Sequence, residues 1–162
     1  MKARLARLLA ELRADRQACV RHLDELAGLA LGDTTLPGDL TRAAWALHHA
    51  YTSVESILSR CARVLEGATP TGPDWHRALL EGAALALPTV RPPLLKPQTV
   101  RLLHELRAFR HFVRHAYAIE LDEGHLARLQ DVAGRLAVPL GADLDALEGM
   151  VEALLAQVSA EG

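Results

Sequence analysis

The sequence predicts an all-α protein, an up-and-down bundle of four long helices with one short extra helix. Half of the 162 residues are apolar and only 4% are aromatic, a composition that favours helices over sheets. Apolar residues recur at helical spacing along most of the chain, and no stretch alternates as a strand would. The stretches between these periodic runs are short, as in helical bundles. The length suits a single domain over 1–162.

The first half of the chain contains two long amphipathic helices. Leucines at three- and four-residue spacing, with Arg and Glu between them, predict the first helix over 2–31. Segment 32–38 combines Gly, Asp, Thr and Pro, which favour turns. A second apolar stripe predicts a helix over 40–66, and Gly67 is suited to end it.

A short helix and a proline-rich connection follow. The short helix is predicted over 75–87, with Asp74 as its N-cap. Four of the eight prolines then lie between residues 88 and 97. Because proline lacks a backbone donor and restricts the residue before it, this segment is predicted to be extended.

Two further helical regions complete the bundle. Pro97 is well placed to open a helix over 98–119, because proline is favoured in the first turn. Asp122 is expected to cap a final helical region that reaches nearly to the C-terminus. Pro139 and Gly141 interrupt the apolar stripe of this region and predict a kink or a short break.

Charge and cysteine content narrow the class of protein. A net charge of −2 argues against a protein that coats nucleic acid with its whole surface. Cys19 and Cys61 have no Cys or His neighbour at zinc-ligand spacing, so we expect buried, reduced thiols. The N-terminal stretch MKARLARLLAELRADR returns to charge too quickly for a signal peptide, and no run approaches the ~18 apolar residues of a membrane span. We therefore expect a cytoplasmic protein with no membrane segment.

The predicted helix over 98–119 concentrates positive charge on one side. Between Lys96 and Leu121 there are five Lys or Arg residues against two Glu. Projection at about 100° per residue places an apolar arc on one side of the helix. The opposite arc carries one phenol and six side chains that can be cationic: Tyr117, Arg110, Arg114, Arg107, His111, His104 and His115. Such a face repels itself unless it meets solvent, acidic groups or an anion such as phosphate.

The sequence RHFVRHAY at residues 110–117 reads R-x4-H-x-Y, with a polar residue directly after the arginine. This pattern resembles the signature of the HEPN superfamily, specifically of the HepT-like toxins of HEPN/MNT toxin–antitoxin pairs. The trailing tyrosine, the late position in a long helix and the all-α chain strengthen the resemblance. Family members often carry Asn where this chain has His111, which bears on the role of that residue. The resemblance implies a HEPN-like helical bundle.

The resemblance also implies a metal-independent endoribonuclease, with no cofactor, whose homodimer lines one cleft with motifs from both subunits. RNA can be cut by its own 2′-OH if a base, an acid and a cation assist. By the resemblance, His115 is the acid/base and Arg110 the phosphate clamp. These two lie about 140° apart on an ideal helix, so a dimeric cleft or a local helix distortion must bring them to one phosphate. The other cationic side chains of the face are expected to bind substrate: His111, Arg114, Arg107 and His104.

Tyr117 has a separate implied role. In the HepT-like family, a cognate MNT-type nucleotidyltransferase antitoxin silences the toxin by transferring AMP to the tyrosine of the motif. A bulky anionic adduct two residues from His115 would block the cleft and neutralise its cations. The implied partners are therefore a second copy of the chain, the antitoxin, and a tRNA or mRNA substrate.

Two alternatives stay open at this point. His111 and His115 form an H-x3-H pair that can bind zinc from one helix face, although no Glu follows His111 and no third ligand is nearby. The other alternative is a non-catalytic HEPN-type substrate-binding partner of a small nucleotidyltransferase. A cluster on the second helix, Trp45, His48, His49 and Tyr51, is interpreted as helix-packing aromatics with two surface histidines.

Overall fold

The computed structural model describes residues 1–32, 35–36, 38–114 and 121–160, with 110–114 described by their backbone alone. In these residues the chain forms five α-helices and no strand, which confirms the predicted all-α bundle. The helices are α1 (Lys2–Ala27), α2 (Asp39–Cys61), α3 (Trp75–Ala83), α4 (Pro97–Arg114) and α5 (Glu123–Ala160). A π-helical turn, η1 (Ala62–Glu66), directly continues α2.

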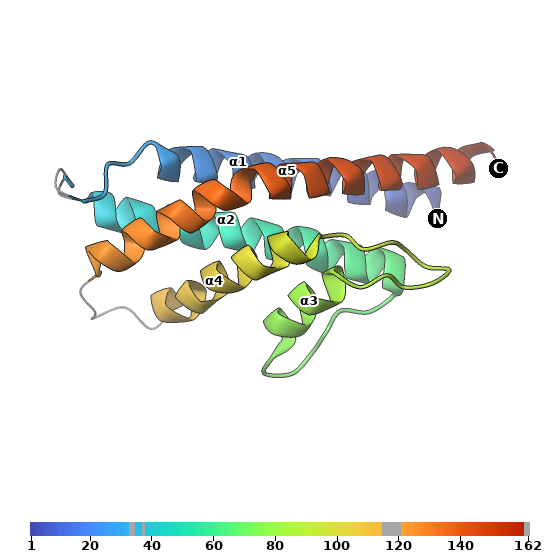
Figure 1. The fold of residues 1–162 in the computed structure, drawn as a ribbon. Coiled ribbons are helices and arrows are strands. Elements are labelled where there is room, and N and C mark those ends of the chain that lie inside the picture. Colours follow the sequence, from blue (N-terminus) through green and yellow to red (C-terminus); the bar gives the residue numbers. More distant parts are fainter. Residues whose placement is uncertain (33–34, 37, 115–120, 161–162) are drawn as a thin grey trace.

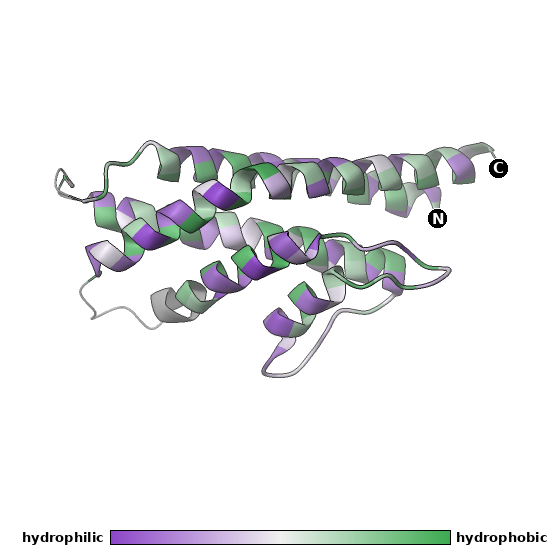
Figure 2. Ribbon diagram, in the orientation of Figure 1, coloured by the Kyte–Doolittle hydropathy of each residue, from purple (hydrophilic) through white to green (hydrophobic). Residues whose placement is uncertain are grey.

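The four long helices run alternately in opposite directions, as Figure 1 shows. Helix α1 packs against α2 and α5, and α4 packs against the same two helices from the other side. The short α3 packs against α2 and α4, below α4 in the view of Figure 1. Figure 2 shows apolar and polar residues alternating along every long helix, the pattern of amphipathic helices around one core.

Leucines from every long helix fill the core. The side chains of Leu8, Leu47, Leu103, Leu126 and Leu136 are almost completely buried. Burying one such side chain stabilises the fold by about 1.5–3 kcal/mol. Core packing therefore holds the bundle together far more than any single surface ion pair does.

Both cysteines lie in this core, as expected. Cys19 and Cys61 are buried free thiols. Burial raises the pKa of each thiol to about 12, because the thiolate would lose its hydration. The two thiols are therefore protonated and unreactive near neutral pH.

Three helix ends differ from the prediction. The first helix ends at Ala27 rather than at residue 31, because the chain leaves the helix at Gly28. Helix α3 ends at Ala83 rather than at residue 87, since Leu87 pairs with Arg91 in a turn instead. Asp74 occupies the N-cap position of α3 but makes no capping hydrogen bond there. Its φ of −98° and ψ of 16° lie outside the extended region from which a cap side chain reaches the first N–H groups.

Other predicted boundaries are confirmed. Gly67 ends the helical segment with a φ of +83°, a left-handed conformation that favours glycine. Helix α4 begins at Pro97. Asp122 caps α5, because its Oδ1 accepts a hydrogen bond from the His125 N–H at 2.6 Å. The expected end of α4 at residue 119 lies outside the described residues.

Helix α5 continues through Pro139, so of the two predicted alternatives, a kink or a short break, the break does not occur. Leu136 and Leu140, on either side of the proline, are both buried in the core. Their packing keeps both halves helical at the cost of the one backbone hydrogen bond that proline cannot make. Figure 1 shows the first part of α5 inclined to its last part, so the helix bends instead of breaking.

An aspartate from α5 anchors the start of α4. Asp143 is only 3% exposed, and its Oδ2 accepts hydrogen bonds from the Lys96 N–H at 2.9 Å and the Thr99 hydroxyl at 2.6 Å. One side chain therefore satisfies two donors at the N-terminus of α4. Its negative charge also interacts favourably with the positive end of the helix dipole. This contact fixes the position of the basic helix within the bundle.

None of the described helices combines the length and the apolar composition needed to cross a membrane.

Candidate functional site

Helix α4 presents its apolar arc to the core, as the helical projection predicts. Leu102, Leu106 and Phe109 are buried, and the Phe109 ring lies 5.8 Å from that of His125 at the start of α5. On the opposite arc, the two residues with described side chains, His104 and Arg107, are only partly buried.

The structure describes the residues of the basic arc to different degrees. Arg110, His111 and Arg114 belong to the helical backbone of α4, but their side chains lie outside the description. His115 and Tyr117 lie wholly outside the described residues. The two catalytic residues, the modification site and the H-x3-H zinc pair therefore remain predictions. Among the described residues, no group of three His, Cys, Asp or Glu side chains is placed to hold a metal ion.

His104 and Arg107 are the two residues of the arc whose side chains are described. Both are partly buried, on the side of α4 where α3 packs. Burial lowers the pKa of His104 below its ordinary value of 6.5, and the nearby charge of Arg107 lowers it further. The Arg107 Nε is buried and makes no hydrogen bond within the described residues. A buried donor is costly to leave unpaired. Because this atom has no access to solvent, it does not by itself support the predicted role of Arg107 in substrate binding, which stays a prediction.

Helix α3 opposes this charge with one acidic residue. Glu81 pairs with Arg77 at 2.7 Å, and this hydrogen bond, with smaller effects of His104 and Arg107, lowers the pKa of the Glu81 carboxyl. The negative charge of Glu81 acts on His104 in turn and favours its protonated form. His104 is thus influenced by one carboxylate, that of Glu81, and by the guanidinium groups of Arg77 and Arg107.

We expect His104 to titrate with a midpoint below 6.5 in the folded protein, because burial and Arg107 both disfavour its charged form. The Arg107→Leu substitution is expected to raise that midpoint, and Glu81→Gln to lower it. Proton NMR of the imidazole C2–H across pH 4–8 would measure all three. Since the folded state disfavours protonation, His104 makes the fold less stable as pH falls below 6.5. A midpoint unchanged in both variants would contradict this arrangement.

A second imidazole lies near α4 and was not identified from the sequence. Glu55 of α2, only 3% exposed, pairs with Nδ1 of His76 at the start of α3. The indole of Trp75 stacks on the His76 ring, with 3.5 Å between ring centroids. Burying a carboxylate costs several kcal/mol unless it is paired, so Glu55 is held by its partners. No local sequence pattern indicates this pair, because Glu55 and His76 lie 21 residues apart in the chain.

The aromatic cluster on α2 only partly matches its interpretation. Tyr51 is 1% exposed and packs in the core, as expected. Trp45 is 60% exposed, so it does not serve as a core-packing residue. Its indole contacts the His49 ring edge-on at 4.2 Å, and His49 lies 5.2 Å from both His22 and His48.

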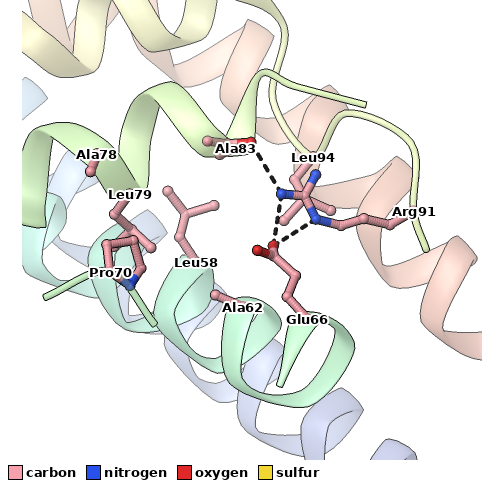
Figure 3. A pocket seen from close by; sticks show the side chains of 10 residues that line it. Leu58, Ala62, Glu66, Pro70, Ala78, Leu79, Ala83, Arg91 and Leu94 are labelled. Carbon is pink, nitrogen blue, oxygen red and sulfur yellow. Dashed lines mark hydrogen bonds and ion pairs between the residues drawn. The ribbon is translucent and has the colours of Figure 1, made fainter. Parts of the chain in front are cut away.

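The pocket in Figure 3 is structural. Arg91, whose side chain is 2% exposed, reaches into the space between α2 and α3, and its guanidinium faces the carboxylate of Glu66. Its nitrogens donate to Glu66 at 2.8 Å and to the carbonyl oxygens of Leu85, Pro92 and Gly82. Every nitrogen of this arginine is thereby occupied, so the pocket anchors the proline-rich connection and offers no charge to a ligand.

Comparison with known proteins identifies a family that this chain matches. The family model described as HepT-like protein matches residues 42–151, a span that includes α2, α3, α4 and most of α5. Neither the curated proteins nor the solved structures contain a significant match.

Proposed function

The chain belongs to the HepT-like family, and from this membership we propose that it is the toxin of a type II HEPN/MNT toxin–antitoxin pair. The proposed activity is metal-independent endoribonucleolytic cleavage in a cleft between two copies of the chain. The observation that carries the proposal is the R-x4-H-x-Y sequence at 110–117, on and directly after α4, within the matched region.

The proposed reaction uses the RNA's own 2′-OH as nucleophile. A base removes the 2′ proton while the 2′ oxygen attacks the adjacent phosphorus. The bond from phosphorus to the 5′ oxygen then breaks, and an acid protonates the leaving oxygen. The products are a 2′,3′-cyclic phosphate and a 5′-hydroxyl. His115 from two subunits can supply the base and the acid, because a two-fold axis duplicates the residue.

Arginine has the geometry that this reaction needs from its cation. The guanidinium of Arg110 can donate two parallel hydrogen bonds to phosphate oxygens and stabilise the charge that develops there. Four neighbours on the same arc are proposed to bind the flanking phosphates: His111, Arg114, Arg107 and His104. The described pair, His104 and Arg107, supports this role because it lies off the buried apolar arc of α4 and is partly exposed.

Cleavage of labelled tRNA and mRNA by the purified protein in excess EDTA tests the proposal. Products in EDTA support a metal-independent ribonuclease. A folded, unmodified dimer that cuts neither RNA would contradict it and would favour the substrate-binding partner as the function. Intact mass, recorded on the same sample, shows whether an AMP adduct is already present.

Tyr117 is the proposed site of control by the antitoxin. Incubation with the cognate nucleotidyltransferase and ATP is expected to add one AMP to the wild-type protein and to abolish cleavage. Tyr117→Phe lacks the acceptor oxygen, so it should stay unmodified and active under the same conditions. Intact mass and cleavage rate measure both effects, with Tyr51→Phe as the matched control because Tyr51 is buried. Inhibition of Tyr117→Phe together with an AMP adduct would place the modification elsewhere.

A further inference from the structure

A shallow groove lies between α2 and the start of α3. One hollow is bordered by Thr52, Ser56, Ser59, Arg63 and Trp75, and a second by Ser59, Arg63, Thr69 and Trp75. Because the hollows share Ser59, Arg63 and Trp75, they form one continuous groove. Glu55 and Arg60 also line the first hollow, but Glu55 is paired with His76, and Arg60 with Glu11 and Asp15. The unpaired part of the lining therefore combines hydroxyl groups, the Arg63 guanidinium and an indole.

Arg63 provides positive charge in this groove. Its side chain is exposed and forms no ion pair within the described residues, whereas its neighbour Arg60 is held by Glu11 at 2.7 Å and Asp15 at 2.8 Å. Arg63 also borders a hollow against α1, where Arg4 adds a second arginine with no ion pair in the described chain. These side chains suit successive phosphates of an extended strand.

Trp75 provides a fixed aromatic surface. It packs partly against the core, and its ring stacks on His76, which is itself held by the buried Glu55. A ring fixed in this way loses little conformational freedom when a ligand stacks on it. Stacking on an aromatic side chain accepts any base, and it is the usual means of holding unpaired nucleotides.

The groove itself is lined by residues of α2, η1, the loop before α3 and Trp75, and its link to α4 runs through α3. Helices α3 and α4 run antiparallel and in contact, so the first turn of α3 lies toward the C-terminal end of α4 (Figure 1). The charges of Arg77 and Glu81, two and six residues after Trp75, act on His104. Since α3 runs antiparallel to α4, Trp75 lies at the end of α3 that is level with the C-terminal half of α4.

We propose that this groove binds an unpaired nucleotide of the RNA strand next to the cleaved bond. The base stacks on Trp75, and the phosphate pairs with Arg63. The inference rests on the proposed ribonuclease function and extends its substrate site from α4 to α2 and α3. A free nucleotide has the same chemistry, so the test must separate the two ligands.

The test uses the full chain carrying His115→Ala, which prevents turnover, and Trp45→Phe, which leaves Trp75 as the only tryptophan. Single-stranded RNA, AMP and ATP are titrated separately while tryptophan fluorescence is recorded. RNA is expected to quench Trp75, and neither free nucleotide should do so at the same concentration. Filter binding then gives the affinity of further variants.

Trp75→Leu is expected to weaken RNA binding about 5- to 100-fold, the range of one stacked base, and Trp75→Phe less. Arg63→Gln should weaken binding and reduce its salt dependence by about one counterion. Arg135→Gln is the matched control, because Arg135 is exposed on α5, which does not contact α3. Thermal unfolding shows whether each variant is folded. If Trp75→Leu does not fold, the affinity of Trp75→Phe and the quenching of Trp75 test the proposed stacking instead.

The proposed nucleotide site in the groove would be overturned if RNA bound without quenching and with equal affinity in the Trp75 and Arg63 variants. The ribonuclease proposal would then remain intact. Quenching by AMP or ATP as strong as by RNA would assign the groove to a free nucleotide instead. Absence of RNA binding in every variant, together with no cleavage by the wild type, would overturn both proposals.

Discussion

Replacing His115 or Arg110 by alanine is expected to lower RNA cleavage by about 10²- to 10⁴-fold for each substitution. Loss of a general acid/base removes proton transfer at both ends of the reaction. Loss of the clamp leaves the charge of the transition state unbalanced. Arg110→Lys should recover little activity, because an ammonium group cannot donate two parallel hydrogen bonds as a guanidinium does. Initial cleavage rates in EDTA measure all three.

Arg101→Ala is the matched control for these substitutions. Arg101 is exposed on α4, two to three turns before the motif and outside the predicted basic arc. Its removal is expected to change the cleavage rate less than about threefold, since it neutralises no phosphate at the reacting bond. Equal losses in Arg101→Ala and Arg110→Ala would mean that the helix contributes only general positive charge.

Asp143→Ala is expected to destabilise the protein by about 2–4 kcal/mol. The substitution leaves the Lys96 N–H and the Thr99 hydroxyl, which is 0% exposed, without their acceptor. It also removes the negative charge at the N-terminus of α4. Urea denaturation measures the loss, and Asp143→Asn should lose less because it retains an acceptor oxygen.

Asp145→Ala provides the comparison, because Asp145 lies on the same helix and pairs with Arg16 at the surface, where its side chain is 68% exposed. An exposed pair contributes about 0–1 kcal/mol. Equal destabilisation by the two substitutions would contradict the anchoring role of Asp143. Because Asp143 positions α4, Asp143→Ala should also reduce cleavage at temperatures where the protein is still folded.

The helices could be predicted from the sequence because their apolar periodicity is local. The glycine at 67, the proline that opens α4 at 97 and the Asp122 cap are also local signals, and their predicted roles agree with the structure. At Pro139 the local signal left a kink and a break as alternatives. The buried leucines beside the proline keep α5 helical through tertiary contacts, so the helix bends without breaking.

In the candidate site, too, the features with a local sequence signal could be predicted and those made by distant residues could not. The projection of α4 correctly separates buried Leu106 and Phe109 from the partly exposed His104 and Arg107, because both sets repeat with the helical period. The Asp143 anchor and the Glu55–His76 pair could not be predicted. Asp143 lies 44 and 47 residues from its two partners, and Glu55 lies 21 residues from His76. Only the packing of different helices brings these residues together.

In the proposed reaction, the RNA's own 2′-OH performs the cleavage in a metal-independent site. The most direct test compares an RNA cut at a mapped position with the same RNA carrying a single 2′-deoxynucleotide on the 5′ side of that bond, both in excess EDTA. The account predicts cleavage of the first, with 2′,3′-cyclic phosphate and 5′-hydroxyl ends, and none of the second at that bond. Cleavage of the deoxy-substituted RNA at the same bond, or products with 5′-phosphate ends, would contradict it.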